Sequence, residues 1–214
     1  LLKEWQFLEQ QLKDDSPYSG KVKIQSPGSC GLQFYSQLLA LQTKHQGLNI
    51  DYRFAPNISV EQAVANHNAD IGFLTQAPTL SEVTSHKIGT EPLLLVTPAH
   101  IKTPTWQALC ELGFIAHPDA KHHAQLLLSE NYPQFEHLEQ IKHTGFSNQI
   151  SLILEPVSLG LGFTVLPAHA ISAFNKPKLI QTHYLANPIS ENIYVCHHRN
   201  RPLAKRMHTV IYTI

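Results

Sequence analysis

Charged residues are scarce in this chain of 214 residues: Asp, Glu, Lys and Arg make up 15% of it, against roughly 25% in typical soluble domains. Neither sign is in excess, because 16 Lys and Arg residues balance 16 Asp and Glu residues. Nucleic-acid-binding domains usually carry a basic surplus, so this balance argues against nucleic-acid binding by these residues. The 14 histidines make the net charge rise as the pH falls through about 6.5.

Cysteines are few and odd in number: Cys30, Cys110 and Cys196. Because a disulfide framework requires pairs, we expect reduced thiols and a cytoplasmic location. Apolar runs such as Leu93 to Val96 are too short to span a bilayer, and the first residues lack the apolar run of a secretory signal. The apolar share of 43% is that of a globular protein with a core.

Strand and helix patterns alternate from residue 20 onward. We expect strands at 21–25, 48–54, 70–74 and 91–96, with helices at about 31–45 and from Ser59 between the first three. Ser29 is the expected cap of the first of these helices, with Leu32, Tyr35, Leu38 and Leu39 facing inward. A strand–helix–strand–helix–strand order predicts a parallel sheet covered by helices.

The second half of the chain repeats this alternation. The pattern predicts a helix over 147–159 that Pro156 kinks or interrupts, followed by strands near 162–166, 179–185 and 193–197. Two α/β units of this size suggest a bilobed molecule, and small ligands commonly bind between such lobes.

Residues 1–15 form a separate amphipathic pattern. Apolar side chains recur at Leu1, Trp5, Leu8 and Leu12, which is the spacing of a helix with one apolar stripe. The segment is interpreted either as the first helix of the fold or as a linker or dimerisation helix.

Five stretches together resemble the effector-binding domain of LysR-type transcriptional regulators, and the resemblance covers residues 20–214. The stretches are GKVKIQSPGSCG (20–31), NADIGFL (68–74), EPLLLVTPAH (91–100), WQALCELGFIAH (106–117) and LGLGFTVLPAHAI (159–171). The resemblance implies an α/β fold with two Rossmann-like subdomains, the periplasmic-binding-protein type II (LysR substrate-binding) arrangement, and two crossover strands. It divides the chain into 1–17, the end of a linker or dimerisation helix; 18–97, the first part of subdomain I; 98–192, subdomain II; and 193–214, the return crossover and last helix of subdomain I.

The same resemblance implies a ligand-sensing regulatory domain and not an enzyme. A small polar or carboxylate metabolite would bind in the interlobe cleft and control transcription through an N-terminal winged helix-turn-helix, which residues 1–214 do not include. The implied partners are a second copy of this fragment, a homotetramer for the full-length protein, and DNA only through that other domain, with no membrane and no cofactor. Two alternatives remain: a periplasmic-type solute-binding protein, and an enzyme on the same bilobed fold, such as a dehydratase.

The turn at residues 26–29 is the strongest candidate ligand site. Its backbone N–H groups would lie at a helix N-terminus, which favours anions, and the Ser26 and Ser29 hydroxyls can donate to a carboxylate. The alternative interpretation is a simple helix cap. By resemblance, this turn holds the polar head of the effector.

Further candidates follow from the ends of the predicted strands in both lobes. The full set of expected effector-binding residues is Ser26, Gly28, Ser29, Asn57, Ser59, Thr75, Gln76, His117, Ser147, Asn148 and Phe163. No spacing brings more than two metal ligands together, so no metal site is expected. The chain lacks the G-x-S-x-G nucleophile elbow and an acid–base pair in the cleft, so no catalytic residues are assigned.

Overall fold

The computed structural model describes residues 15–214, so the amphipathic pattern predicted over residues 1–15 lies almost entirely outside the described residues. The chain divides into two compact units. The first unit combines residues up to Pro27 with Gln33–Lys87 and Tyr194–Ile214, and the second combines Gly28–Leu32 with Ile88–Ile193. Among residues 15–214, no helix has both the length and the apolar content that a membrane span requires.

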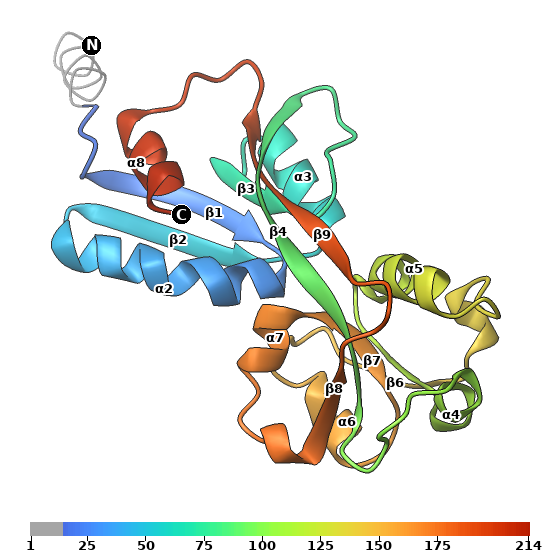
Figure 1. Ribbon diagram of the computed structural model, residues 1–214. Helices are drawn as coiled ribbons and strands as arrows, with labels where there is room; N and C mark the ends of the chain where they lie inside the picture. Colours follow the sequence, from blue (N-terminus) through green and yellow to red (C-terminus); the bar gives the residue numbers. More distant parts are fainter. Residues whose placement is uncertain (1–14) are drawn as a thin grey trace, which may run out of the picture. The chain divides into compact units, whose positions relative to one another are not determined.

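The first unit contains a mostly parallel sheet with helices packed against it (Figure 1). Its strands are β1 (Gly20–Ser26), β2 (Leu48–Phe54), β3 (Ile71–Leu74) and the end of β9 (Ile189–His198), and its helices are α2 (Gly28–Lys44), α3 (Asn57–Ala65) and α8 (Lys205–Thr213). The strand order is β2–β1–β3–β9. β1 runs parallel to both β2 and β3, and β9 is antiparallel to β3. The predicted crossover helices α2 and α3 connect these parallel strands, as such connections require.

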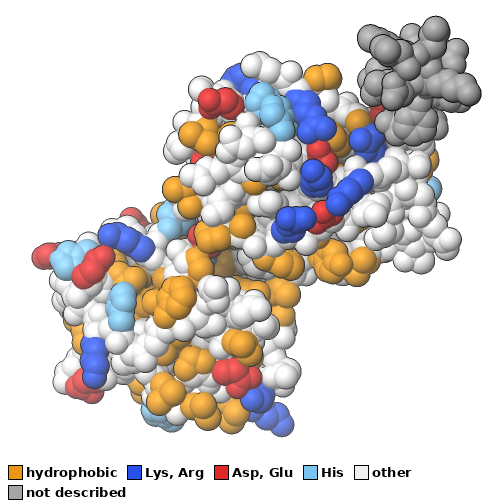
Figure 2. Space-filling model, turned by 180° about the vertical axis from the view of Figure 1, so that it is seen from behind, with side chains coloured by type: hydrophobic (Ala, Val, Ile, Leu, Met, Phe, Trp, Pro, Cys, Tyr) orange, Lys and Arg blue, Asp and Glu red, His pale blue; other side chains and the backbone are white. Residues whose placement is uncertain are grey.

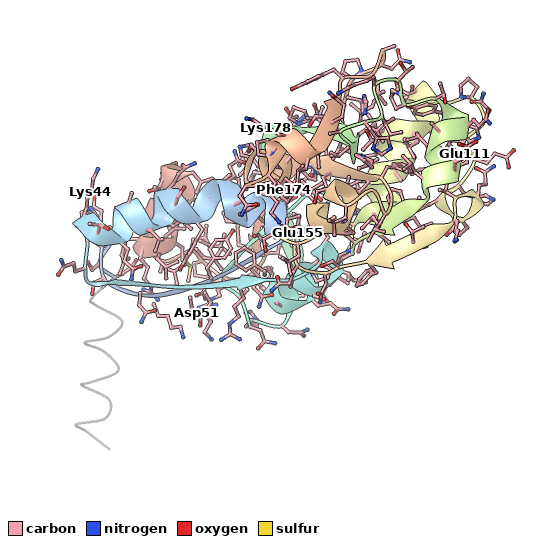
Figure 3. All side chains as sticks on the ribbon, turned by 90° about the horizontal axis from the view of Figure 1, so that it is seen from below. Lys44, Asp51, Glu111, Glu155, Phe174 and Lys178 are labelled. Atoms are coloured by element: carbon pink, nitrogen blue, oxygen red, sulfur yellow. The ribbon has the colours of Figure 1, made fainter. Side chains whose placement is uncertain are left out.

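Helix α2 buries a different stripe from the one that the sequence predicts. Leu38 is buried as expected, but its inward neighbours are Cys30 and Phe34. Leu32, Tyr35 and Leu39 are about 40% exposed, so the prediction that they face inward is wrong. The ring of Phe34 lies 4.8 Å from the ring of Phe73 on β3, which orients the helix on the sheet. Figure 3 shows α2 lengthwise, with Lys44 at its last turn.

The second unit is built on antiparallel pairs together with one small parallel sheet. Its strands are β4 (Val83–Pro98, from Ile88 onward), β5 (Phe114–Ala116), β6 (His143–Phe146), β7 (Thr164–Pro167), β8 (Ile180–His183) and the start of β9. β4 pairs antiparallel with β7 and β8, whereas β5 and β6 are parallel. Its helices are α4 (Trp106–Leu112), α5 (Ala120–Asn131), α6 (Leu154–Ser158) and α7 (Ala168–Ser172), with 3₁₀ turns η1 (Leu138–Gln140) and η2 (Pro177–Leu179). Phe114, Leu127, Leu128 and Phe163 lie in its main core.

The helix predicted over 147–159 is much shorter in the structure. Only α6 is helical there, and turns and irregular backbone precede it. Pro156 lies in the first turn of α6, where a backbone N–H has no partner within the helix in any case. The proline therefore stands near the beginning of a short helix instead of kinking a long one.

Two long strands carry the chain from one unit to the other. The chain enters the second unit between Lys87 and Ile88, within β4, and returns between Ile193 and Tyr194, within β9. β4 continues unbroken through Gly89, and Pro98 is its last residue.

Candidate ligand-binding site

The N-terminus of α2 presents backbone N–H groups that no side chain caps. β1 ends at Ser26, Pro27 follows with φ −56°, and the helix begins at Gly28, so Ser29 lies inside the first turn and is not its cap. The prediction that Ser29 caps a helix beginning near Gly31 is therefore wrong. The capping position is a proline without a side-chain cap hydrogen bond, and the first turn contains no acidic residue. The first N–H groups of a helix have no partner within it, and they carry the positive end of the helix dipole.

Gly28 allows a loop of the second unit to approach this turn closely. A Cβ atom at Gly28 would lie 2.9 Å from the Cβ of Ile150, a distance that side chains do not tolerate. Ser147 and Asn148 lie three and two residues before Ile150 in this loop, and they are half-buried and exposed respectively. The hydroxyl of Ser147 accepts from the backbone N–H of Gln149 at 3.2 Å. The structure therefore brings Gly28, Ser29 and this loop into one unit.

Ser26 and Ser29 have different surroundings although both are buried. The Ser26 hydroxyl donates to the carbonyl oxygen of Pro27 and lies 2.8 Å from the hydroxyl oxygen of Tyr52. Its hydrogen is thus engaged within the protein. The Ser29 side chain is 4% exposed and hydrogen-bonds with Cys30, whose pKa is raised by burial and by the carboxylates of Glu191 and Glu91. Both hydroxyls thus have a partner within the protein, and of the two serines only Ser29 lies in the first turn of α2.

Two of the predicted residues of the first unit bind each other. The Asn57 amide nitrogen donates to the Thr75 hydroxyl at 3.0 Å, and the Thr75 backbone N–H donates to the Asn57 amide oxygen at 2.8 Å. These two hydrogen bonds join the start of α3 to the residue that follows β3. Ser59 is half-buried in α3, and Gln76 is exposed after β3. Unit 1 therefore presents these polar residues after the carboxyl ends of β2 and β3, the two strands that flank β1.

His117 is a buried, neutral imidazole. Its Nε2 lies 3.0 Å from the carbonyl oxygen of Val165, to which it donates, and its ring centre lies 5.2 Å from that of His123. Burial, with the neighbouring His123, lowers the pKa of His117 to about 3. At neutral pH it therefore acts through hydrogen bonding and carries no charge.

Two buried glutamates of the second unit each contact one histidine. Glu191 on β9 lies 3.0 Å from Nε2 of His123 on α5. Glu91 on β4 accepts from the backbone N–H of His169 and contacts its Nδ1, both at 2.8 Å. Burial raises the pKa of Glu91, against the hydrogen bonds from His169, and Glu191 raises it further. Charged groups as deeply buried as these require partners to remain ionised.

A protein-family model described as LysR substrate binding domain matches residues 15–214. This chain belongs to the LysR substrate-binding domain family. The predicted fold class, two α/β subdomains of the periplasmic-binding-protein type II kind, is thereby confirmed. No curated protein sequence gives a significant match.

Solved structures of LysR-family regulators are similar to this chain. The reduced form of the OxyR regulatory domain from Pseudomonas aeruginosa has a TM-score of 0.71 at 16% identity, covering 92% of this chain and 98% of its own. A mutant of the OxyR2 regulatory domain from Vibrio vulnificus has a TM-score of 0.75 at 16% identity, and the match covers 92% of this chain and 95% of that domain. HinK, a LysR family transcriptional regulator from Pseudomonas aeruginosa, has a TM-score of 0.72 at 16% identity, and the match covers 99% of this chain and 75% of HinK. At such identities the likeness establishes the fold alone.

Phe163 occupies the core of this LysR domain. Its side chain is fully buried, and its ring lies edge-on to that of Phe114 with centres 5.2 Å apart. Its backbone N–H also donates to the carbonyl oxygen of Gly113. The ring therefore has no exposed surface on which a ligand could stack in this structure, and its observed contacts are with the core.

The sequence interpretation did not select Glu91, Glu191 or His123 as site residues. Each glutamate stands beside a strongly apolar strand segment, and this is the signal that could have found them. A carboxylate within a buried strand requires a specific partner. Among residues 15–214, no group of three or more His, Cys, Asp and Glu side chains has the geometry to hold a metal ion.

A surface pocket of about 310 Å³ lies elsewhere in the second unit. It is lined by Pro98, Ala99, His100, Ser158, Leu159, Gly160 and Leu179. None of the predicted effector-binding residues lines it, so it does not coincide with the candidate site at α2.

Proposed function

We propose that this LysR domain senses a small carboxylate, or a similarly anionic metabolite, at the N-terminus of α2. The observation that carries the proposal is the first turn of α2, which has no side-chain cap hydrogen bond and no acidic residue and holds the buried Ser29. A helix N-terminus stabilises an anion by about 0.3–1 kcal/mol, and by up to about 2 kcal/mol when partly buried. Gly28 and the loop at Ser147 and Asn148 flank the site.

In this proposal ligand binding controls a DNA-binding domain of the same protein, a winged helix-turn-helix that acts in the cytoplasm. The ligand shifts the regulator between two arrangements only to the extent that it binds one of them more tightly. The family match favours this role over a periplasmic-type solute-binding protein. A dehydratase-like enzyme is disfavoured, because the candidate residues at α2 are neutral and supply no acid–base pair.

A screen of small carboxylates by thermal shift, followed by calorimetric titration, tests the proposed site. A ligand present at 100 times its Kd adds about 2.7 kcal/mol to the free energy of unfolding. Ser29→Ala should weaken the binding of any such carboxylate about tenfold, since a hydrogen bond to a charged group is lost. Ser36→Ala, on the exposed side of the same helix, is the control and should leave the affinity unchanged. Carboxylates that bind Ser29→Ala as tightly as the original chain would contradict the proposal.

We further propose that two copies of this domain pair through the exposed apolar stripe of α2, and that full-length chains assemble as tetramers. Leu32, Tyr35 and Leu39 form this stripe; Figure 2 shows hydrophobic side chains at the surface of both units. Leu39→Asp should convert a sedimenting dimer to monomer because it places a charge in the paired stripe. Tyr184→Asp, at an 85% exposed position outside α2 in the sequence, should leave the dimer intact. A monomer at high concentration before any substitution would refute the pairing.

A further inference from the structure

Three buried side chains of the second unit form what we call the acid–imidazole cluster: Glu91 on β4, Glu191 on β9 and His123 on α5. They are 0%, 2% and 3% exposed. β4 and β9 are adjacent strands, and Glu191 contacts His123 directly. The cluster lies outside the set of residues that the sequence analysis assigned to ligand binding.

The cluster lacks hydrogen-bond donors. One oxygen of each glutamate has a partner: Glu191 Oε2 contacts His123, and Glu91 Oε1 contacts His169. Among residues 15–214, four buried side-chain atoms have no partner, and three of them are Glu91 Oε2, Glu191 Oε1 and His123 Nδ1. A buried polar atom without a partner destabilises the fold, and a charged one does so more strongly.

All three of these atoms accept hydrogen bonds. A carboxylate oxygen only accepts. When Nε2–H of His123 donates to Glu191, Nδ1 of the same neutral ring is also an acceptor. The two glutamates are close enough for the charge of one to disfavour ionisation of the other. The cluster is therefore short both of donors and of positive charge.

The charges of the cluster reach the first turn of α2, where the proposed carboxylate site lies. Cys30, in the first turn of α2, is influenced electrostatically by both Glu191 and Glu91. His169, which contacts Glu91, has a side chain that is 43% exposed, so a direct neighbour of the cluster reaches solvent. A ligand held by the first turn of α2 is thus within the electrostatic influence of two buried carboxylates.

We propose that the acid–imidazole cluster binds a protonated amino group of the effector, which makes the effector a zwitterion of the amino-acid class. An ammonium group supplies three N–H donors and one positive charge, which match three acceptors and an excess of negative charge. A metal ion fits less well, because no three-ligand group has the required geometry among residues 15–214. The inference rests on the proposed function, since the carboxylate of the same ligand would occupy the α2 site.

Matched ligand pairs test the inference. L-alanine, L-glutamate and L-phenylalanine are compared by calorimetry with propionate, glutarate and 3-phenylpropionate, which lack only the amino group. Methylammonium is compared by thermal shift with tetramethylammonium, which has the same charge and no N–H donor. We expect the amino acid of at least one pair to bind about tenfold or more tightly than its partner, and methylammonium alone to stabilise the protein.

Glu191→Gln removes one carboxylate while keeping the shape of the side chain. It should abolish the preference for the amino acid and leave the affinity for the deaminated acid unchanged, which shows that the variant folds. Glu111→Gln is the matched control, since Glu111 lies exposed on α4 (Figure 3). It should keep the full preference.

The outcomes separate the inference from the proposed function. Deaminated acids that bind as tightly as the amino acids, with sensitivity to Ser29→Ala, would overturn the inference and leave the carboxylate site standing. Amino acids whose preference survives Glu191→Gln would also overturn it. If no pair shows a preference while Glu191→Gln raises the melting temperature without ligand, the cluster shares a proton and binds no amine. Failure of every carboxylate and amine to bind would overturn both proposals.

Discussion

Gly113→Ala should destabilise the domain far more than Gly160→Ala, although both glycines have nearly the same φ angle. The φ angles are +78° and +81°, and a positive φ costs an alanine about 1–2 kcal/mol. Gly113 also has a ψ angle of 170°, a combination that essentially only glycine adopts. At Gly160 a Cβ atom would meet nothing within 4 Å. At Gly113 it would lie 2.5 Å from Cγ2 of Thr144 and 2.8 Å from the carbonyl oxygen of Lys142. Overpacking adds about 1–3 kcal/mol, so we expect a total loss of about 3 kcal/mol or more at Gly113.

Urea unfolding of the two variants measures this difference directly. The Gly160 variant is the control, because its added Cβ atom has a positive φ and meets no neighbouring atom within 4 Å. Gly113 directly precedes β5, which pairs with β6 in the second unit. The decrease in unfolding free energy should therefore come from the second unit. Equal losses of unfolding free energy in the two variants would show that the close approach of Gly113 to Thr144 is not present in solution.

Cys30 and Cys196 should react with a thiol reagent orders of magnitude more slowly in the native chain than in the unfolded chain. Burial raises the pKa of the Cys196 thiol from 9.0 to about 12, with a further contribution from Glu61. This rise alone lowers the reactive thiolate at neutral pH about thousandfold. Burial also raises the pKa of Cys30. Maleimide labelling followed by mass spectrometry of each peptide gives the three rates separately.

Cys110 is the internal control for this experiment. It is only partly buried, and burial raises its pKa as well, so it should label before the other two. All three cysteines are free of disulfide bonds. Native labelling of Cys30 or Cys196 at the unfolded rate would contradict the burial described here and would favour a thiol-based response over ligand sensing.

The order of strands and helices follows from local sequence patterns, whereas the side of α2 that packs on the sheet does not. Alternating polar and apolar residues locate β1 and β2 because each strand has one buried face. Along α2, both Leu32–Leu39 and Cys30–Leu38 are stripes with helical spacing, so periodicity cannot choose between them. The choice is made by tertiary packing of Phe34 on Phe73. If copies pair as proposed, the leucines outside that contact serve the interface.

The residues at which helices begin and end depend on contacts between residues that are far apart in the sequence. Ser29 has the chemistry of a cap, yet Pro27 precedes the first turn and the helix begins at Gly28. Gly28 is required by Ile150, a contact that only the folded chain shows. In the same way, Glu191 and His123 are distant in sequence and meet only when β9 lies beside α5. Sequence patterns predict the α2 turn as a candidate anion site, but they do not reveal the buried carboxylates whose charges reach it.

Amide chemical shifts during ligand titration test the α2 site most directly. In a ¹⁵N-labelled domain, addition of a bound carboxylate should shift the backbone amides of Gly28, Ser29 and Cys30 by the largest amounts, because these N–H groups would donate to the ligand. The amides around the separate pocket at Leu159 and Leu179 should stay in place. Saturating binding that moves the Leu159 and Leu179 amides and leaves those of Gly28, Ser29 and Cys30 unchanged would contradict anion recognition by α2.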